Sequence, residues 1–354
     1  MRTLESRRLI GSLEVLHDTY PLNSETEQAL CKLYADCRQT SPYCHPLWVD
    51  LLGSAFDCEA GWCVIRSGGE IVAAMPYLRK KLARSLLIRV DALPYDCYAS
   101  PLLSPTLDRA DAACAAAALY RFLASRGAIA RFFPAEWLGE DTAFPVGEFS
   151  ATRKRSEDVY LKQLSGISDE KALLSSYNPH HRKQVNTANK SPLDFYKATT
   201  TNDLNDFYHI LSETMTRAGH PVKFPFESIV SGGMKLIEAG VGVCYLSKIE
   251  GRCCAGVFVL RSKATAIYWL GATTSDKELL RHRPAFGLFH RAMIDSVRAG
   301  AQIFELGAAP TQGLLDFKRR WGATATPQTT YTVGNRWILS ALDLRAKVLA
   351  WSAR

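Results

Sequence analysis

The sequence lacks any hydrophobic run long enough to cross a membrane. No stretch of the 354 residues approaches the ~18 apolar residues that a spanning helix needs, and the alanine-rich stretch 110–123 is interrupted by Asp111, Tyr120 and Arg121. The start of the chain, MRTLESRRLIGSLEVL, has neither a long apolar region nor a small-residue cleavage site. We therefore expect a soluble, cytoplasmic protein without a transmembrane segment or a secretory signal.

The short motifs of several enzyme and metal-binding classes are also missing. The ten cysteines are scattered without a CxxC pair, which favours reduced core thiols over disulfides or a metal site. His180 and His181 would diverge on a helix, and no further Cys or His lies at ligand spacing, so we expect no metal. A G-x-S-x-G elbow, a P-loop and a dinucleotide fingerprint are all absent, which argues against those chemistries.

Composition and charge indicate a globular protein with an anionic ligand. The chain is 47% hydrophobic and 22% charged, and its length is typical of two domains or one large domain. The formal net charge of +8 favours a nucleotide, a phosphate ester, a tRNA or a membrane surface as partner, without choosing among them.

The stretch from Gly287 to Gly322 organises the chain. Apolar residues at helical spacing predict a helix over 287–299, which Gly300 ends, and 303–306 reads as a short buried strand. A turn follows over 307–313, and then a basic loop with the sequence FKRRWG over 317–322. Such a loop suits a cleft for an anion, although a solvated surface turn would have the same composition.

The two halves of the chain share an order of elements. The segment 61–65 resembles 242–246, the segment 74–81 resembles 256–263, and each half then has a helix, a glycine and a strand. We therefore predict an α/β (α+β) fold of two tandem units, each a mostly antiparallel central sheet flanked by helices. The basic segment 150–157 is the linker candidate, which gives domains 1–150 and 151–354. The first half lacks the basic loop, so the chemistry is expected in the second unit or between the two.

These features together resemble the FemABX-like and BioF2-like acetyltransferases of the GNAT superfamily. The resemblance covers about residues 40–325, and it rests on the tandem units, on FKRxxG, and on the segments SPYCHPLWVDLL (41–52), AAMPYLRKK (73–81), NPHHRKQVNTANK (178–190) and IYWLGATTSDKELLRHRPAFGLFHRAMI (267–294). It implies two GNAT-like domains and transfer of an acyl or aminoacyl group to a primary amine. The donor is an aminoacyl-tRNA in FemX-type members and is thought to be an acyl-CoA in other relatives, with no permanently bound cofactor.

The resemblance also implies functional residues in this sequence. Phe317 and Lys318 match the family's Phe-Lys, with the lysine near the acyl carbonyl or the tRNA 3′ end, and Arg182 matches an arginine that holds acceptor phosphates. Tyr268 and Arg283 are weaker matches. The sequence departs from the family in its Glu-Leu-Gly-Ala segment at 305–308, and it lacks the glycine-spaced loop by which ordinary GNAT enzymes hold the CoA pyrophosphate.

The residue types fit these roles on physical grounds as well. Amine attack on an ester or thioester builds negative charge on the carbonyl oxygen, which Lys318 or the amides of 307–309 could stabilise by ~3–4 kcal/mol. We expect Arg281 and Arg283, before a helix N-terminus, to bind the donor phosphate, and Arg182 and Lys183 to bind the acceptor phosphate. Further contacts with substrate are expected from Phe317, Tyr268, Arg319 and Trp321.

The amine must also lose a proton, and three routes remain open. His290 or Glu305 could act as the base, or the substrate could assist its own deprotonation. A packed histidine, and a carboxylate paired with Arg319 or Arg320, are the structural alternatives for these two residues.

Three classes of function follow, in this order. The first is an acyl-CoA-dependent N-acyltransferase. The second is an aminoacyl-tRNA-dependent transferase of cell-envelope biosynthesis that binds tRNA through residues 150–155, 180–190 and 318–320. The third is a non-catalytic binding module. An anionic or nucleotide-linked acceptor and a peripheral contact with a membrane surface suit the charge, whereas nothing in the sequence indicates an oligomeric state.

Overall fold

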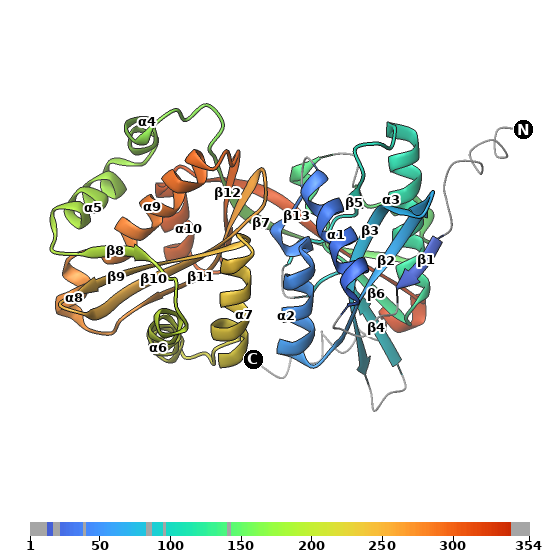
Figure 1. Cartoon of the computed structure of the whole chain (residues 1–354), viewed down its shortest axis with the longest axis horizontal. Coiled ribbons are helices and arrows are strands. Elements are labelled where there is room, and N and C mark those ends of the chain that lie inside the picture. The colour runs from blue at the N-terminus through green and yellow to red at the C-terminus, as the bar shows by residue number, and fades with distance from the viewer. Residues whose placement is uncertain are drawn as a thin grey trace, which may run out of the picture. The chain divides into compact units, whose positions relative to one another are not determined.

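The computed structural model describes residues 13–16, 22–37, 40–82, 87–94, 97–139 and 143–340. The chain forms two compact units, which we call unit 1 (residues 1–157 and 328–354) and unit 2 (residues 158–327). Two long strands, β7 (Thr152–Gln163) and β13 (Thr324–Gly334), each contain a boundary between the units. Figure 1 labels the elements of both units.

Unit 1 is a sheet with helices packed on it. Its strands run in the order β1-β2-β3-β4-β6-β13, β5 pairs separately with β3, and only β4 and β6 pair in parallel. Helices α1, α2 and α3 pack on β2 and β3, and Trp62, Cys63, Val64 and Ile65 of β2 are all buried, so both faces of the sheet are covered. The elements are β1 (Leu13–Leu16), α1 (Ser24–Asp36), α2 (Pro46–Phe56), β2 (Glu59–Ser67), β3 (Glu70–Leu82), β4 (Leu87–Asp91), β5 (Leu102–Leu103), α3 (Arg109–Ser125) and β6 (Ile129–Phe132), with 3₁₀ turns η2 (Pro42–Cys44), η3 (Glu136–Leu138) and η5 (Val146–Glu148).

Unit 2 repeats this plan. Its strands run in the order β7-β12-β11-β10-β9-β8, and only β11 and β12 pair in parallel. Its further elements are α4 (Glu170–Ser175), α5 (Pro179–Lys190), β8 (Asp194–Lys197), α6 (Thr201–Arg217), α7 (Phe226–Glu238), β9 (Gly242–Ile249), β10 (Arg252–Arg261), β11 (Thr265–Thr273), α8 (Lys277–Arg281), α9 (Pro284–Arg298), β12 (Ile303–Ala308) and α10 (Gln312–Arg320).

Alternation along β10 explains how helices cover both faces of the unit 2 sheet. Val257 and Val259 belong to the core cluster that includes Phe289 and Met293 of α9. Gly256 and Phe258 point the other way, since a β-carbon on Gly256 would lie 2.4 Å from the Phe207 ring of α6. Accordingly α5 and α9 lie on one face of this sheet and α6 and α7 on the other (Figure 1).

The structure confirms the predicted α/β architecture of two similar units, each with mostly antiparallel strand pairs flanked by helices, but it corrects two local predictions. The expected linker at 150–157 is the first part of β7. The expected basic loop over 317–322 is mostly helical, because Thr311 caps a helix, α10, whose last turn holds Lys318, Arg319 and Arg320. Cations in the last turn interact favourably with the helix dipole.

The compact units also differ from the predicted domains 1–150 and 151–354. Residues from Gln328 onward group with unit 1, because Tyr331–Gly334 of β13 pair with Ile129–Phe132 of β6. Asp158–Gln163 of β7 lie in unit 2, where β7 pairs with β12. Thus β7, which follows β6 in the chain, pairs with β12 of unit 2. In turn β13, which follows β12 in the chain, pairs with β6 of unit 1.

Candidate functional site

The parallel strands β11 and β12 of unit 2 stop pairing shortly after they begin. Their register runs from Thr265 opposite Ile303 to Ile267 opposite Glu305. Beyond this point β12 continues beside β7, with Ala308 opposite Val159, while β11 stays beside β10 up to Thr273. The two strands therefore no longer pair with each other from Tyr268 onward in β11 and over 306–308 in β12.

Lys318 of α10 reaches the end of β12, where β12 no longer pairs with β11. Its Nζ donates to the carbonyl oxygen of Ala308 at 2.5 Å, and the whole residue is only 5% exposed. Burial lowers the pKa of Lys318 to about 8, and the charge of Glu305 opposes that shift. A lysine in this state is a desolvated cation near neutral pH.

Glu305 is the second polar side chain at the same place. It is 2% exposed, and its Oε1 accepts a hydrogen bond from the amide of Gly307. Gly307 has a φ of 79°, and a β-carbon built on it would lie 3.5 Å from Lys318 Nζ and 3.8 Å from Glu305 Oε1. Both distances are ordinary contacts, so it is the left-handed turn that favours glycine at 307. The charge of Glu305 raises the pKa of Lys318, so the cation that interacts with this carboxylate is Lys318 rather than Arg319 or Arg320.

Aromatic side chains pack beside this polar pair. Phe317 precedes Lys318 and lies 5.4 Å, between ring centroids, from Phe289 of α9, which in turn lies 4.8 Å from Tyr268. Burial raises the pKa of Tyr268 to about 12, so its hydroxyl stays protonated. Trp321 is fully buried against Phe289 and Tyr177. The expectation that Trp321 contacts substrate is therefore corrected: its ring is core packing that supports Phe317.

A patch of basic side chains forms where α5 begins and α10 ends. The amide of Asn178, the N-cap of α5, donates to the carbonyl oxygen of Arg320 at 2.9 Å. Arg182 is half-buried and Lys183 is exposed on the first turns of α5, and Arg319 is exposed on α10. The structure therefore brings the predicted residues Arg182, Lys183 and Arg319 onto neighbouring elements.

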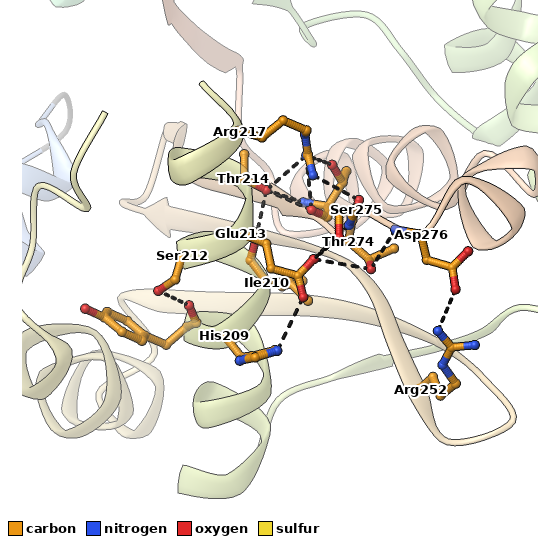
Figure 2. A network of polar contacts seen from close by, with 12 residues as sticks. His209, Ile210, Ser212, Glu213, Thr214, Arg217, Arg252, Thr274, Ser275 and Asp276 are labelled. Atoms are coloured by element: carbon orange, nitrogen blue, oxygen red, sulfur yellow. Dashed lines mark hydrogen bonds and ion pairs between the residues drawn. The ribbon is translucent and has the colours of Figure 1, made fainter. Parts of the chain in front are cut away.

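The connection from β11 to α9 is tied to α6 by a network of polar contacts (Figure 2). Glu213 accepts hydrogen bonds from the amide and hydroxyl of Ser275, at 2.8 and 2.9 Å. The hydrogen bond from the Ser275 amide is the main cause of the lowered pKa of Glu213. Arg217 donates to Thr273 and Thr274, and Arg252 pairs with Asp276, the N-cap of α8. The segment that carries Arg281 and Arg283 is therefore held at its start.

Arg281 and Arg283 themselves lie in different settings. Arg281 is exposed and pairs with Glu278 at 2.7 Å, an ion pair that solvent screens. Arg283 is the N-cap of α9, has a φ of 58°, and is followed by Pro284 at the first helical position. Arg283 thus lies at the N-terminus of α9, the positive end of the helix dipole, and its contact with an anion stays a prediction.

The structure separates His290 from Lys318. The His290 ring is 1% exposed, and its two nitrogens bond to the Tyr177 hydroxyl (3.2 Å) and to Glu170 Oε1 (3.0 Å). Burial lowers the pKa of His290, and both of its ring nitrogens have partners, the Tyr177 hydroxyl and Glu170. These contacts fit a packed histidine, so we favour Glu305 or the substrate as the base.

The sequence analysis missed three residues of this region. Glu170 and Tyr177 belong to no motif, and their bonds with His290 join positions 113 and 120 residues apart. Lys162 is 3% exposed, donates to Ser176 Oγ at 2.6 Å, and has its pKa lowered to about 8 by burial. Lys162 lies between Leu161 and Gln163 near the end of β7, and nothing in this short sequence indicates that the lysine is buried.

No group of three His, Cys, Asp or Glu side chains that could hold a metal occurs among the described residues. The described helices include none that is long and apolar enough to cross a membrane.

Residues 178–319, which include Lys318, match the family model of an acetyltransferase (GNAT) domain. FemX is similar in structure, with a TM-score of 0.72 and 13% identity over 93% of this chain and 99% of its own. The chain is also similar to L-PGS from Bacillus licheniformis (TM-score 0.58, 14% identity, 92% of this chain and 96% of that one).

A third similar structure is the C-terminal domain of a putative lysylphosphatidylglycerol synthetase from Agrobacterium fabrum. Its TM-score is 0.56 and its identity 17%, over 93% of this chain and 98% of that one. No curated protein matches the sequence. At these identities the structural likenesses show the fold alone, and the match to a GNAT domain covers residues 178–319.

Proposed function

We propose, on the premise that this chain is a FemABX-like acyltransferase of the GNAT superfamily, that it moves an acyl group from an acyl-CoA thioester to a primary amine. The acceptor would carry a phosphate, a sugar or a peptide. The observation that carries the proposal is Lys318, a buried cation at the point where β11 and β12 part, inside the segment that matches the GNAT domain.

Lys318 would stabilise the charge that develops during transfer. The amine nitrogen attacks the thioester carbonyl, a C–N bond forms, and the carbonyl oxygen becomes negative until the C–S bond breaks and the thiolate leaves. A buried ammonium near that oxygen is worth more than an exposed one, because water does not screen it. The amine proton would pass to Glu305 or to the leaving thiolate.

The donor would bind between β11 and β12, where the two strands no longer pair. The extended arm of CoA carries amide groups that can take the place of the side-chain bonds to the Gly307 amide and the Ala308 carbonyl oxygen. Arg283, with the N-terminus of α9, would meet the phosphates of the donor, and Arg281 would have to exchange Glu278 for phosphate. Phe317 and Tyr268 would line the acyl group, with Phe289 behind them.

A second candidate, transfer from an aminoacyl-tRNA, is favoured by the basic patch on α5 and α10. Arg182 and Lys183 lie on α5, whose N-cap amide bonds to Arg320 of α10, and Arg319 lies on α10 next to Lys318, so a phosphate backbone could bind beside the site. The name lysylphosphatidylglycerol synthetase, borne by one structural neighbour, denotes an aminoacyl group on a lipid. An acceptor of that kind would bring this protein to a membrane surface.

The donor can be tested by binding before any acceptor is known. The purified protein is titrated with acetyl-CoA and with bulk charged tRNA at two salt concentrations. An acyl-CoA enzyme should bind acetyl-CoA and bind tRNA weakly, whereas tight tRNA binding that falls steeply with salt would favour the second candidate.

Matched variants sharpen this test. Arg283→Ala should weaken acetyl-CoA binding, and Arg319→Ala should weaken tRNA binding. Arg121→Ala, which removes an exposed arginine on α3 of unit 1, should change neither. If the protein bound neither donor, the acyltransferase proposal would fail and the binding-module reading would stand.

A further inference from the structure

A cavity in unit 2 has a lining that includes neither Lys318 nor Glu305. It has a volume of about 360 Å³ and is lined by residues of α4, α5, β8, β9 and α9. Its polar lining consists of Glu170, Asn189, Lys197, His290, Arg291, Asp295 and Arg298, and its apolar lining of Phe195, Leu288 and Ile294, with Tyr196 and Tyr245. A cavity of this size matches a small metabolite.

Arg291 presents an oriented guanidinium to this cavity. Its planar group lies 3.6 Å from the centroid of the Phe195 ring, and Nη1 donates to Asn189 Oδ1 at 3.1 Å and to the Gly287 carbonyl oxygen at 3.3 Å. Within the part of the chain that the structure describes, Nε and Nη2 of Arg291 donate to no side chain or backbone group. These remaining donors suit a carboxylate, which accepts two parallel hydrogen bonds.

Glu170 offers the complementary charge. Its Oε1 bonds to His290, while Oε2 has no partner among the described residues, and the side chain is 49% exposed. Asp295 differs, because its oxygens already accept from Lys197 at 2.7 Å and lie 3.5 Å from Arg298. The cavity therefore has one carboxylate with a free oxygen and a group of cations that its acids do not fully neutralise.

We propose that this cavity is a binding site for an acidic amino acid. Arg291 binds the α-carboxylate, Glu170 binds the α-ammonium, and Lys197 and Arg298 bind the side-chain carboxylate. The formal charges agree with this ligand, since three cations (Lys197, Arg291, Arg298) face two anions (Glu170, Asp295), leaving +1 for a ligand of charge −1. Phe195 and Ile294 contact its methylene groups. The inference concerns binding alone, so it does not depend on the proposed acyl transfer.

The test is isothermal titration of the full-length protein with L-glutamate and L-aspartate. At least one should bind with a dissociation constant below about 1 mM. Glutarate lacks the ammonium, 4-aminobutyrate lacks the α-carboxylate and L-glutamine lacks the side-chain charge, so each should bind about tenfold or more weakly than L-glutamate. Absence of binding by both acidic amino acids at 10 mM would overturn the proposal.

Two variants locate the site. Arg291→Lys keeps the charge but loses the planar fork, and should weaken L-glutamate binding about 10- to 100-fold. Glu170→Gln should weaken L-glutamate binding and leave glutarate binding unchanged, because glutarate has no ammonium for it to meet. Arg252→Lys and Glu227→Gln alter exposed residues outside the cavity and are the matched controls. Binding that survived both cavity variants would place the ligand elsewhere and refute the assignment.

Discussion

The two units contain the same parallel strand pair but finish it differently. In unit 1, β4 and β6 pair as far as Asp91 opposite Arg131, and the buried Asp91 carboxylate lies 2.9 Å from the guanidinium of Arg89 and 2.9 Å from that of Arg131. In unit 2, β11 and β12 pair as far as Ile267 opposite Glu305. At the last paired position, unit 1 thus has Asp91 in ion pairs with two arginines, whereas unit 2 has the buried Glu305.

The chain beyond these positions differs even more. In unit 1, the amide of Ala99 donates to the carbonyl oxygen of Phe133 at 2.9 Å, and Tyr98 stacks on the Phe133 ring at 5.0 Å, so the chain itself occupies the place beside the last strand. In unit 2, the side chains of Glu305 and Lys318 bond to the corresponding strand end. Side chains can exchange such bonds for a ligand more easily than a packed chain segment can, which explains why we place the chemistry in unit 2.

The largest effect should come from removing the cation of unit 2. Lys318→Met keeps a long apolar side chain but loses the charge, so turnover should fall about 10²- to 10³-fold with little change in substrate binding. Steady-state kinetics with the donor identified by titration checks this. Glu136→Gln, on the turn that follows β6 in unit 1, should retain near-normal turnover, and equal losses in both variants would contradict the comparison.

The strand β13 should contribute much of the stability of unit 1. Tyr331 of β13 is 7% exposed, stacks on Phe144 at 4.3 Å and donates to Glu136. Tyr331→Ala should lower the free energy of unfolding by about 3–5 kcal/mol, while Tyr331→Phe should cost only about 1 kcal/mol. Urea unfolding followed by circular dichroism measures both, and a Tyr331→Ala protein of unchanged stability would show that β13 is dispensable to unit 1.

Two glycines with positive φ separate a backbone effect from an effect on the site. Gly307 (φ 79°) lies beside Lys318 and Glu305, whereas a β-carbon on Gly300 (φ 85°) would meet nothing within 4 Å. Alanine at either position should cost roughly 1–2 kcal/mol of stability. Only Gly307→Ala should also slow turnover, by about tenfold, because strain at a φ of 79° shifts the turn whose amide bonds Glu305 beside Lys318. Similar kinetics in the two variants would mean that the Gly307 turn is not part of the site.

The pH dependence gives a smaller but specific effect. Because the pKa of Lys318 is about 8 and the charged form is the active one, turnover should fall as the pH rises through about 8. Glu305→Gln removes the charge that opposes the shift, so the fall should move to lower pH. A pH–rate profile of the two proteins measures this, and a limb that stayed in place would exclude coupling of Glu305 to Lys318.

Stability should change with pH in the opposite sense. Lys318 and Lys162 both have pKa values near 8 in the folded protein, below the ordinary value of 10.5. Between these values the unfolded chain binds more protons than the folded chain, so the free energy of unfolding should rise with pH over that range. Lys318→Met should remove part of this rise and leave the part due to Lys162.

The sequence predicted more of the architecture than of the site. The repeated order of elements predicted two similar units, and the spacing of apolar residues and Gly300 predicted α9 and β12 closely. The helix α10 was missed because its clustered cations resemble a surface loop, although Thr311 is a capping residue. The division of the chain was misjudged because the basic start of β7 resembles a linker.

The sequence by itself determined the repeat, the excess of positive charge and the placement of Lys318 next to a glycine turn, because these depend on residue types and short spacings. Tertiary structure alone decided which strand completes which sheet, that His290 bonds to Glu170 and Tyr177, and that Arg291 stacks on Phe195. The physical reason is that local patterns fix which face of an element is apolar. Pairings between residues far apart in the chain are instead chosen by packing and by the need of buried polar groups for partners.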